Sequence, residues 1–170
     1  MGFEQNGEDQ LQDKPQPVSK LPKKLLEQLG YFAQLCSRIE LAACEVIILI
    51  EKPSRELLEA RRSVLRGKHI KPLIKEFGIA AEKLIETDVY KPYFLELCVW
   101  LEENVEDRHR TTHGVIEIRE RYHSTFFRRK EKIEETLEFD EDDMLHIIAN
   151  AEKVLKSLYD FCDRERALER

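Results

Sequence analysis

Apolar residues recur at helical spacing along most of this chain. Between residues 22 and 51, apolar positions three and four residues apart line one face, which is the pattern of an amphipathic helix. Pro53 then ends the helix, because proline cannot continue the backbone hydrogen bonds, and Gly67 ends a second one. The same spacing predicts four principal helices, over residues 22–51, 55–66, 89–107 and 141–165.

The segments before and between these helices carry weaker patterns. Two short helical pieces are predicted over residues 72–77 and 80–86. Residues 1–20 are polar, include two prolines and have few large apolar side chains, which predicts a disordered tail. We therefore expect one helical domain over residues 21–170.

The pattern changes after Gly114. The β-branched and aromatic residues that follow do not repeat at helical spacing, and they are Val115, Ile116, Ile118, Tyr122, Phe126 and Phe127. They predict a small β-hairpin. Beyond it, Asp140 and Asp143 form a helix cap in this interpretation, because the segment lacks the glycine and distal glutamate of a calcium loop. The expected fold is all-α, an antiparallel helical bundle with a small β-hairpin insertion.

The composition narrows the class of protein. Hydrophobic residues make up 42% and charged residues 36% of the chain, which suits a soluble helical domain. No apolar run is long enough to span a membrane, and the N-terminus lacks the layout of a signal peptide, so we expect a cytoplasmic protein. The net charge of −6 argues against general coating of nucleic acid. The four cysteines have no Cys-x-x-Cys spacing and are interpreted as reduced core thiols.

The residues that carry chemistry form the segment Arg108-His109-Arg110-Thr111-Thr112-His113-Gly114. Arginine keeps its charge, whereas an imidazole titrates near neutrality. Such a pair can cleave RNA without a metal, because His113 can transfer protons and Arg108 can stabilise charge on the scissile phosphate. The alternative is structural: Arg108 pairs with Glu102, Glu103 or Asp107, and His113 caps the helix end. Arg-x4-His-Gly occurs by chance only roughly 0.01–0.02 times in such a chain, so the motif is moderately specific.

This motif, placed after one amphipathic helix and before another, resembles that of the HEPN superfamily of small helical-bundle proteins. The motif matches at Arg108, His109, His113 and Gly114, and the layout is similar over residues 22–163. His109 replaces the more frequent Asn, and the tyrosine that marks one nucleotide-transferase-linked toxin group is absent. The resemblance implies a metal-independent endoribonuclease that acts as a homodimer, with both subunits lining one cleft. It also implies a toxin or anti-phage effector, with an antitoxin or another partner protein.

Helix geometry constrains this site. Arg108 and His113 are five residues apart, so their positions on a regular helix differ by about 140° around the axis. They converge only if the helix end is irregular, if Arg108 folds back, or if a second subunit completes the site. The further candidates for RNA binding are His109, Arg110, Arg119, Arg121 and Arg128. The alternative is a solvated surface, on which glutamates of the hairpin pair with these arginines.

The sequence leaves two functional classes open. The first is the dimeric ribonuclease, and the second is a non-catalytic helical module of the same fold that dimerises or binds a partner protein. A helical regulator unrelated to HEPN proteins is favoured if residues 88–123 form one uninterrupted helix. No cofactor or metal site is expected, because the histidines outside the motif have no metal-ligand spacing. Tyr93, Phe94 and Trp100 are interpreted as core.

Overall fold

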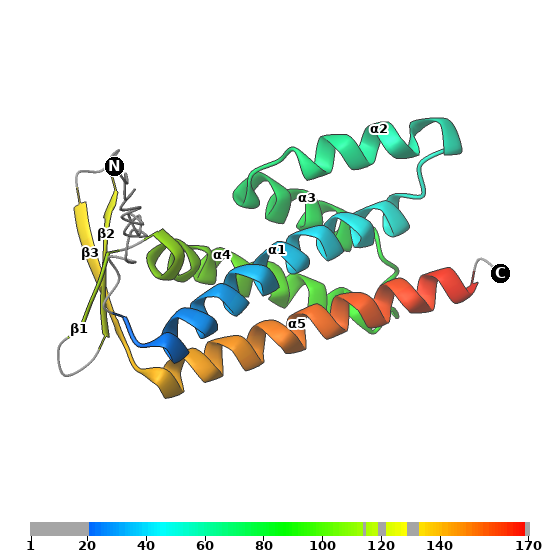
Figure 1. The fold of residues 1–170 in the computed structure, drawn as a ribbon. Coiled ribbons are helices and arrows are strands. Elements are labelled where there is room, and N and C mark those ends of the chain that lie inside the picture. Colours follow the sequence, from blue (N-terminus) through cyan, green and yellow to red (C-terminus); the bar gives the residue numbers. More distant parts are fainter. Residues whose placement is uncertain (1–20, 114, 119–121, 129–132, 169–170) are drawn as a thin grey trace, which may run out of the picture.

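The computed structural model describes the backbone of residues 21–113, 115–118, 122–128 and 133–168, and the side chains of residues 21–102, 116 and 138–168. In chain order the elements are α1 (Lys23–Glu51), α2 (Arg55–Arg66), α3 (Ile70–Glu82), α4 (Tyr90–His113), β1 (Val115–Ile118), β2 (Tyr122–Arg128), β3 (Ile133–Phe139) and α5 (Glu141–Leu168). The predicted helical bundle is confirmed (Figure 1). The predicted disordered tail, residues 1–20, lies outside the described residues.

The two longest helices, α1 and α5, lie side by side and run in the same direction (Figure 1). Side-chain contacts follow in the same order along both: Lys24 with Glu141, then the Tyr31 hydroxyl donating to Glu152 at 2.6 Å. Lys52 and Glu165 meet near the other end. The prediction of an antiparallel bundle is therefore wrong for this pair. The direction alternates from each helix to the next, so α5, the fifth helix, returns to the direction of α1 (Figure 1).

Consecutive helices do run antiparallel, and α3 and α4 show how closely they pack. The predicted piece over residues 72–77 and the first three residues of the one over 80–86 belong to the single helix α3, whereas residues 83–86 are not helical. A Cβ atom added at Gly78 would lie 3.5 Å from the sulfur of Cys98 on α4. This glycine lies where the two helices meet.

Large apolar side chains from three helices form the centre of the core. The ring of Phe94 on α4 lies 5.1 Å from that of Phe77 on α3 and 5.0 Å from that of Phe161 on α5, measured between centroids. All three side chains are almost fully buried. The edge-to-face and tilted arrangements are those that aromatic quadrupoles favour. This cluster therefore fixes the position of α4 between α3 and α5.

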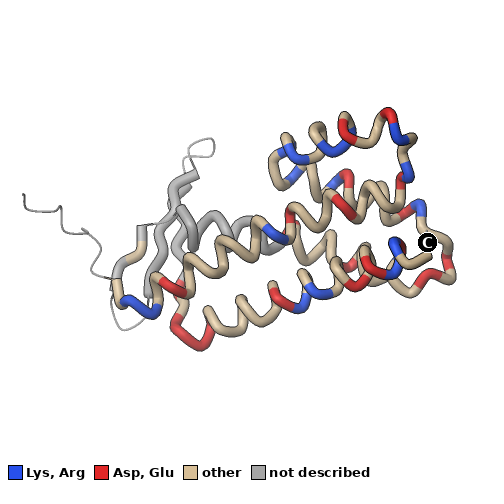
Figure 2. Tube along the Cα trace, turned by 45° about the vertical axis from the view of Figure 1, so that its right-hand side comes forward, with Lys and Arg blue, Asp and Glu red and all other residues tan. Residues whose placement is uncertain are grey.

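Ion pairs hold α2 and α3 against the second half of α1, and Figure 2 shows the mixed charges of these helices. Arg61 of α2 donates two hydrogen bonds of 2.8 Å to Glu51 and a third to Glu76 of α3. These bonds lower the pKa of both carboxyl groups. Nearby, Arg62 pairs with Glu45 at 3.0 Å. The half-buried Arg61 and Arg62 of α2 thus join three helices through ion pairs.

The segment after α4 forms a three-stranded antiparallel sheet in the order β1-β2-β3. We predicted a two-stranded hairpin, so the third strand is a difference. Residues 133–139 are rich in glutamate and gave no strand pattern, but β3 pairs with β2 along its whole length, from Arg128 opposite Ile133 to Tyr122 opposite Phe139. Phe139 is buried and Glu138 is exposed, so one face of the sheet meets the bundle.

The junctions of the sheet with the helices settle two expectations. Helix α4 ends at His113 and β1 begins at Val115, so residues 88–123 are not one uninterrupted helix. At the start of α5, the backbone N–H of Asp140 donates to Asp143, and the N–H of Asp143 donates to Asp140, at 3.0 and 2.9 Å. The predicted helix cap is confirmed. No helix in the described part of the chain is long and apolar enough to cross a membrane.

Candidate functional site

The predicted catalytic residues lie at the carboxyl end of α4, where the chain leaves the helix for the sheet. Arg108, His109, Arg110 and His113 belong to the last six residues of α4, and β1 begins two positions after His113. Their side chains and Gly114 lie outside the described residues, so the predicted pairing of Arg108 with nearby carboxylates also stays a prediction. Both β2 and β3 contact α4, which gives the motif a position between helix and sheet (Figure 1).

The backbone of α4 is helical through both motif positions. The helix therefore does not end between Arg108 and His113, which makes an irregular helix end the least favoured of the three ways to bring them together. Their positions remain about 140° apart around the helix axis. A site that uses both side chains then needs Arg108 to fold back along the helix or needs a second subunit.

The predicted RNA-binding arginines of the sheet are not tested, because their side chains lie outside the described residues. Arg119 and Arg121 lie outside the described residues. Arg128 is the last residue of β2 and lies five positions after His123, so the two residues are on opposite faces of the sheet. His123 pairs with Glu117 of β1 on one side and with Glu138 of β3 on the other. The face that carries the exposed Glu138 therefore also carries Glu117 and His123, and Arg128 lies on the other face. Binding of RNA by Arg128 stays a prediction.

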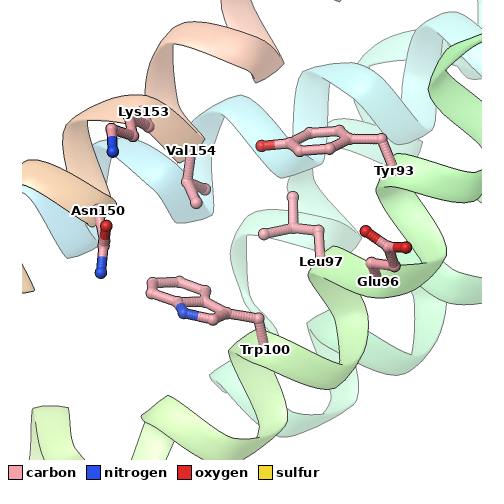
Figure 3. A pocket seen from close by; sticks show the side chains of 7 residues that line it. All are labelled: Tyr93, Glu96, Leu97, Trp100, Asn150, Lys153 and Val154. Carbon is pink, nitrogen blue, oxygen red and sulfur yellow. The ribbon is translucent and has the colours of Figure 1, made fainter.

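A groove between α4 and α5 lies on the same helix as the motif. It has a volume of about 340 Å³ and is lined by Tyr93, Glu96, Leu97, Trp100, Asn150, Lys153 and Val154. In Figure 3, Tyr93 and Trp100 frame two sides of the space, and Leu97 and Val154 lie between them. This volume is within the range of small-molecule sites.

The groove corrects one interpretation and adds residues that the sequence did not reveal. Phe94 is core, as expected, but Tyr93 and Trp100 are only half-buried and border the groove. Asn150 and Lys153 were not candidates, because their helix reads simply as amphipathic. The sequence does show that Asn150 and Lys153 are three residues apart and lie beside the apolar face of α5. Their position next to Trp100, however, follows only from the packing of α5 on α4.

Three of the four cysteines have thiols of raised pKa. Burial raises the pKa of Cys44, and it raises the pKa of Cys98 and of Cys162 to about 11. A raised pKa keeps the thiol protonated and a poor nucleophile at neutral pH. Cys44 and Cys162 are buried, as the interpretation as core thiols predicts, whereas Cys36 and Cys98 are only half-buried, and the reduced state stays a prediction. Within the described residues, no group of three or more His, Cys, Asp or Glu side chains could hold a metal ion.

Comparisons of this chain with protein-family models, with curated proteins and with solved structures found no match.

Proposed function

We propose that this protein is a metal-independent endoribonuclease of the HEPN type that acts as a homodimer. The observation that carries the proposal is the Arg108-x4-His113-Gly114 motif at the end of the long helix α4 of a helical bundle, directly before the sheet. A permanent cation and a group that exchanges protons near neutral pH are the two functions that cleavage of a phosphodiester requires. Neither function needs a bound metal.

The reaction uses the 2′-hydroxyl of the RNA as the nucleophile. His113 accepts the proton of the 2′-OH, the 2′-oxygen forms a bond to phosphorus, and the bond from phosphorus to the 5′-oxygen breaks. The leaving 5′-oxygen takes up a proton, so the products are a 2′,3′-cyclic phosphate and a 5′-hydroxyl. Arg108 stabilises the negative charge that grows on the phosphate oxygens. His109, Arg110, Arg119, Arg121 and Arg128 are the proposed contacts to the RNA backbone.

The dimer follows from helix geometry together with the resemblance. One regular helix holds Arg108 and His113 on different faces, about 140° apart. Two copies of α4 related by a two-fold axis can place Arg108 of one subunit beside His113 of the other, and the symmetry then forms two such pairs. We propose this arrangement, and we propose that the enzyme serves as a toxin or anti-phage effector that an antitoxin or another partner protein restrains.

Incubation of the purified protein with total RNA in EDTA tests the proposed activity. The natural chain should cleave RNA, and an Arg108→Ala/His113→Ala double variant with the same circular-dichroism spectrum should not. If both proteins leave the RNA intact, or both cleave it equally, the enzyme proposal fails. The chain would then fit the alternative, a non-catalytic helical module that dimerises or binds a partner protein.

A further inference from the structure

The groove between α4 and α5 combines flat aromatic surfaces with an apolar floor. Tyr93 and Trp100 are seven residues apart on α4, which places them on one face and about 10 Å apart along the axis. The floor between them consists of Leu97 and Val154, which are 3% and 7% exposed. In Figure 3 the hydroxyl of Tyr93 and the indole of Trp100 both extend toward α5. The space therefore suits a flat ring better than a chain of irregular shape.

Three polar side chains border the same space: Glu96 on α4, and Asn150 and Lys153 on α5. Among the interactions of the described residues, none of the three forms a hydrogen bond or an ion pair. Their neighbours on α5 behave differently, since Glu152 accepts from Tyr31 and Lys156 pairs with Asp160 at 2.7 Å. The groove thus presents an ammonium group, an amide and a carboxylate that remain available to a ligand.

The groups that line the groove match the chemical groups of a nucleotide. Aromatic side chains stack on unpaired bases of single-stranded RNA, and every base has the required flat face. The amide of Asn150 can both donate to and accept from the edge of a base. Lys153 is one cation, which matches one phosphate. A ligand with several negative charges would meet too little positive charge here.

The position of the groove connects it with the motif. Arg108 follows Trp100 by eight residues and His113 by thirteen, which places them about 12 Å and 20 Å farther along the axis of α4. Arg108 also lies about 80° around the axis from Trp100, so a single strand that lies along α4 can contact both the groove and Arg108. His113 lies about 140° around the axis from Trp100, and in the proposed dimer the strand meets His113 of the partner subunit instead. We infer that the groove binds one unpaired nucleotide of the RNA substrate, outside the cleavage position. This inference rests on the proposed ribonuclease function.

Trp100 is the only tryptophan of the chain, so its fluorescence reports directly on the groove. The full chain carrying His113→Ala, which keeps RNA intact, is titrated with AMP, CMP, GMP and UMP, with a single-stranded oligoribonucleotide, and with ribose 5-phosphate. The nucleotides and the oligonucleotide should quench the fluorescence, because a base stacks on the indole, and ribose 5-phosphate should not. Absence of quenching, or equal quenching by ribose 5-phosphate, would overturn the inference.

Variants in the same background locate the effect by fluorescence anisotropy of a labelled oligoribonucleotide. Trp100→Ala should weaken binding by roughly 5- to 100-fold, the range for loss of one stacked base. Trp100→Phe keeps a ring and should retain most of the affinity, which separates stacking from misfolding. Lys153→Gln should weaken binding, whereas Lys156→Gln, one turn along α5, should not. Unchanged affinity of a folded Trp100→Ala protein would also overturn the inference.

The two proposals fail in different ways. If the natural chain cleaves RNA but nucleotides do not quench Trp100, the ribonuclease stands and the groove is not its nucleotide site. If nucleotides quench Trp100 but no RNA is cleaved, nucleotide binding stands and the proposed cleavage is wrong.

Discussion

The guanidinium of Arg164 donates two hydrogen bonds to the carboxylate of Asp88, at 3.1 and 2.9 Å, although the residues are 76 positions apart. Asp88 also accepts the backbone N–H of Tyr90 at 2.9 Å, and Arg164 stacks 4.6 Å from the ring of that tyrosine. The last turns of α5 are thus joined to the first turn of α4. These two helices form the groove and carry the motif, so this contact anchors the region that we assign to function.

Replacement of Asp88 by asparagine should destabilise the protein by about 1–3 kcal/mol at neutral pH, the range for a hydrogen bond to a charged group. The hydrogen bonds from Arg164 are the main reason that the pKa of Asp88 lies below its ordinary value of 3.8. A lowered pKa in the folded state gives stability that is complete above the unfolded value and is lost as the pH falls through the folded value. The difference between natural chain and variant should therefore narrow below about pH 4, as measured by urea unfolding.

Asp160→Asn is the matched control for this experiment. Its carboxylate pairs with Lys156, but both side chains are at least half exposed, so this pair should contribute much less to stability than the contact of Asp88 with Arg164. A difference between natural chain and Asp88→Asn that stays constant from pH 7 to pH 2 would contradict the role of Asp88 as an ionised partner of Arg164.

The aromatic core makes a second prediction. Phe94→Ala should cost about 3–5 kcal/mol, because it leaves a cavity between Phe77 and Phe161 that the surrounding helices cannot fill. Leu57 on α2 is 61% exposed, and Leu57→Ala should change the free energy of unfolding by no more than about 0.5 kcal/mol. Chemical denaturation of both variants measures the contrast, and equal losses would show that Phe94 does not lie in the core.

The catalytic proposal predicts graded losses of RNA cleavage. His113→Ala should lower the rate by about 10²–10⁴-fold, as expected for removal of a general acid–base group. Arg108→Lys keeps the charge but lacks the planar fork that holds two phosphate oxygens, so its rate should fall between those of the natural chain and Arg108→Ala. His146 is exposed on α5, and His146→Ala serves as the control that retains activity. A His113→Ala protein with the full rate would remove His113 from the mechanism.

Mixing inactive subunits tests whether the site spans two chains. Arg108→Ala and His113→Ala proteins should each be inactive, but refolding them together in equal amounts should restore about a quarter of the natural activity. Half of the dimers are then mixed, and one of the two sites in each mixed dimer has both intact residues. If light scattering shows mixed dimers and the mixture stays inactive, Arg108 and His113 do not combine across the two-fold axis.

The sequence predicted those features that depend on local pattern. Apolar spacing placed three of the four principal helices within three residues of their observed bounds, because each helix buries one stripe. Helix α4 was predicted to end at residue 107 but continues to His113, so Arg108 and His113 lie within the helix and not after it. Asp140 and Asp143 were recognisable as a cap because the two side chains bond to each other's backbone within one turn. The motif at the end of α4 was visible for the same reason, since it is contiguous in the sequence.

Features that depend on packing were not predictable in this way. The pattern predicted two short pieces in place of α3, and the packing of α3 on α4, where Gly78 lies close to Cys98, could not be seen in the sequence. Strand β3 contains Glu134, Glu135 and Glu138, and its identity comes from pairing with β2 rather than from its own pattern. The parallel course of α1 and α5 follows from the number of helices between them. The groove could not be predicted either, because its lining residues come from two helices, α4 and α5, that meet only in the folded protein.

A substrate that lacks a single hydroxyl group tests the central claim most directly. Two otherwise identical oligoribonucleotides are compared in EDTA, one of which has 2′-deoxyribose at the nucleotide whose 2′-oxygen must attack. The all-ribose strand should be cut to give a 2′,3′-cyclic phosphate and a 5′-hydroxyl, and the substituted strand should remain intact, because the nucleophile is missing. Cleavage of the substituted strand at that position, or a 5′-phosphate on the product, would contradict the Arg108–His113 mechanism.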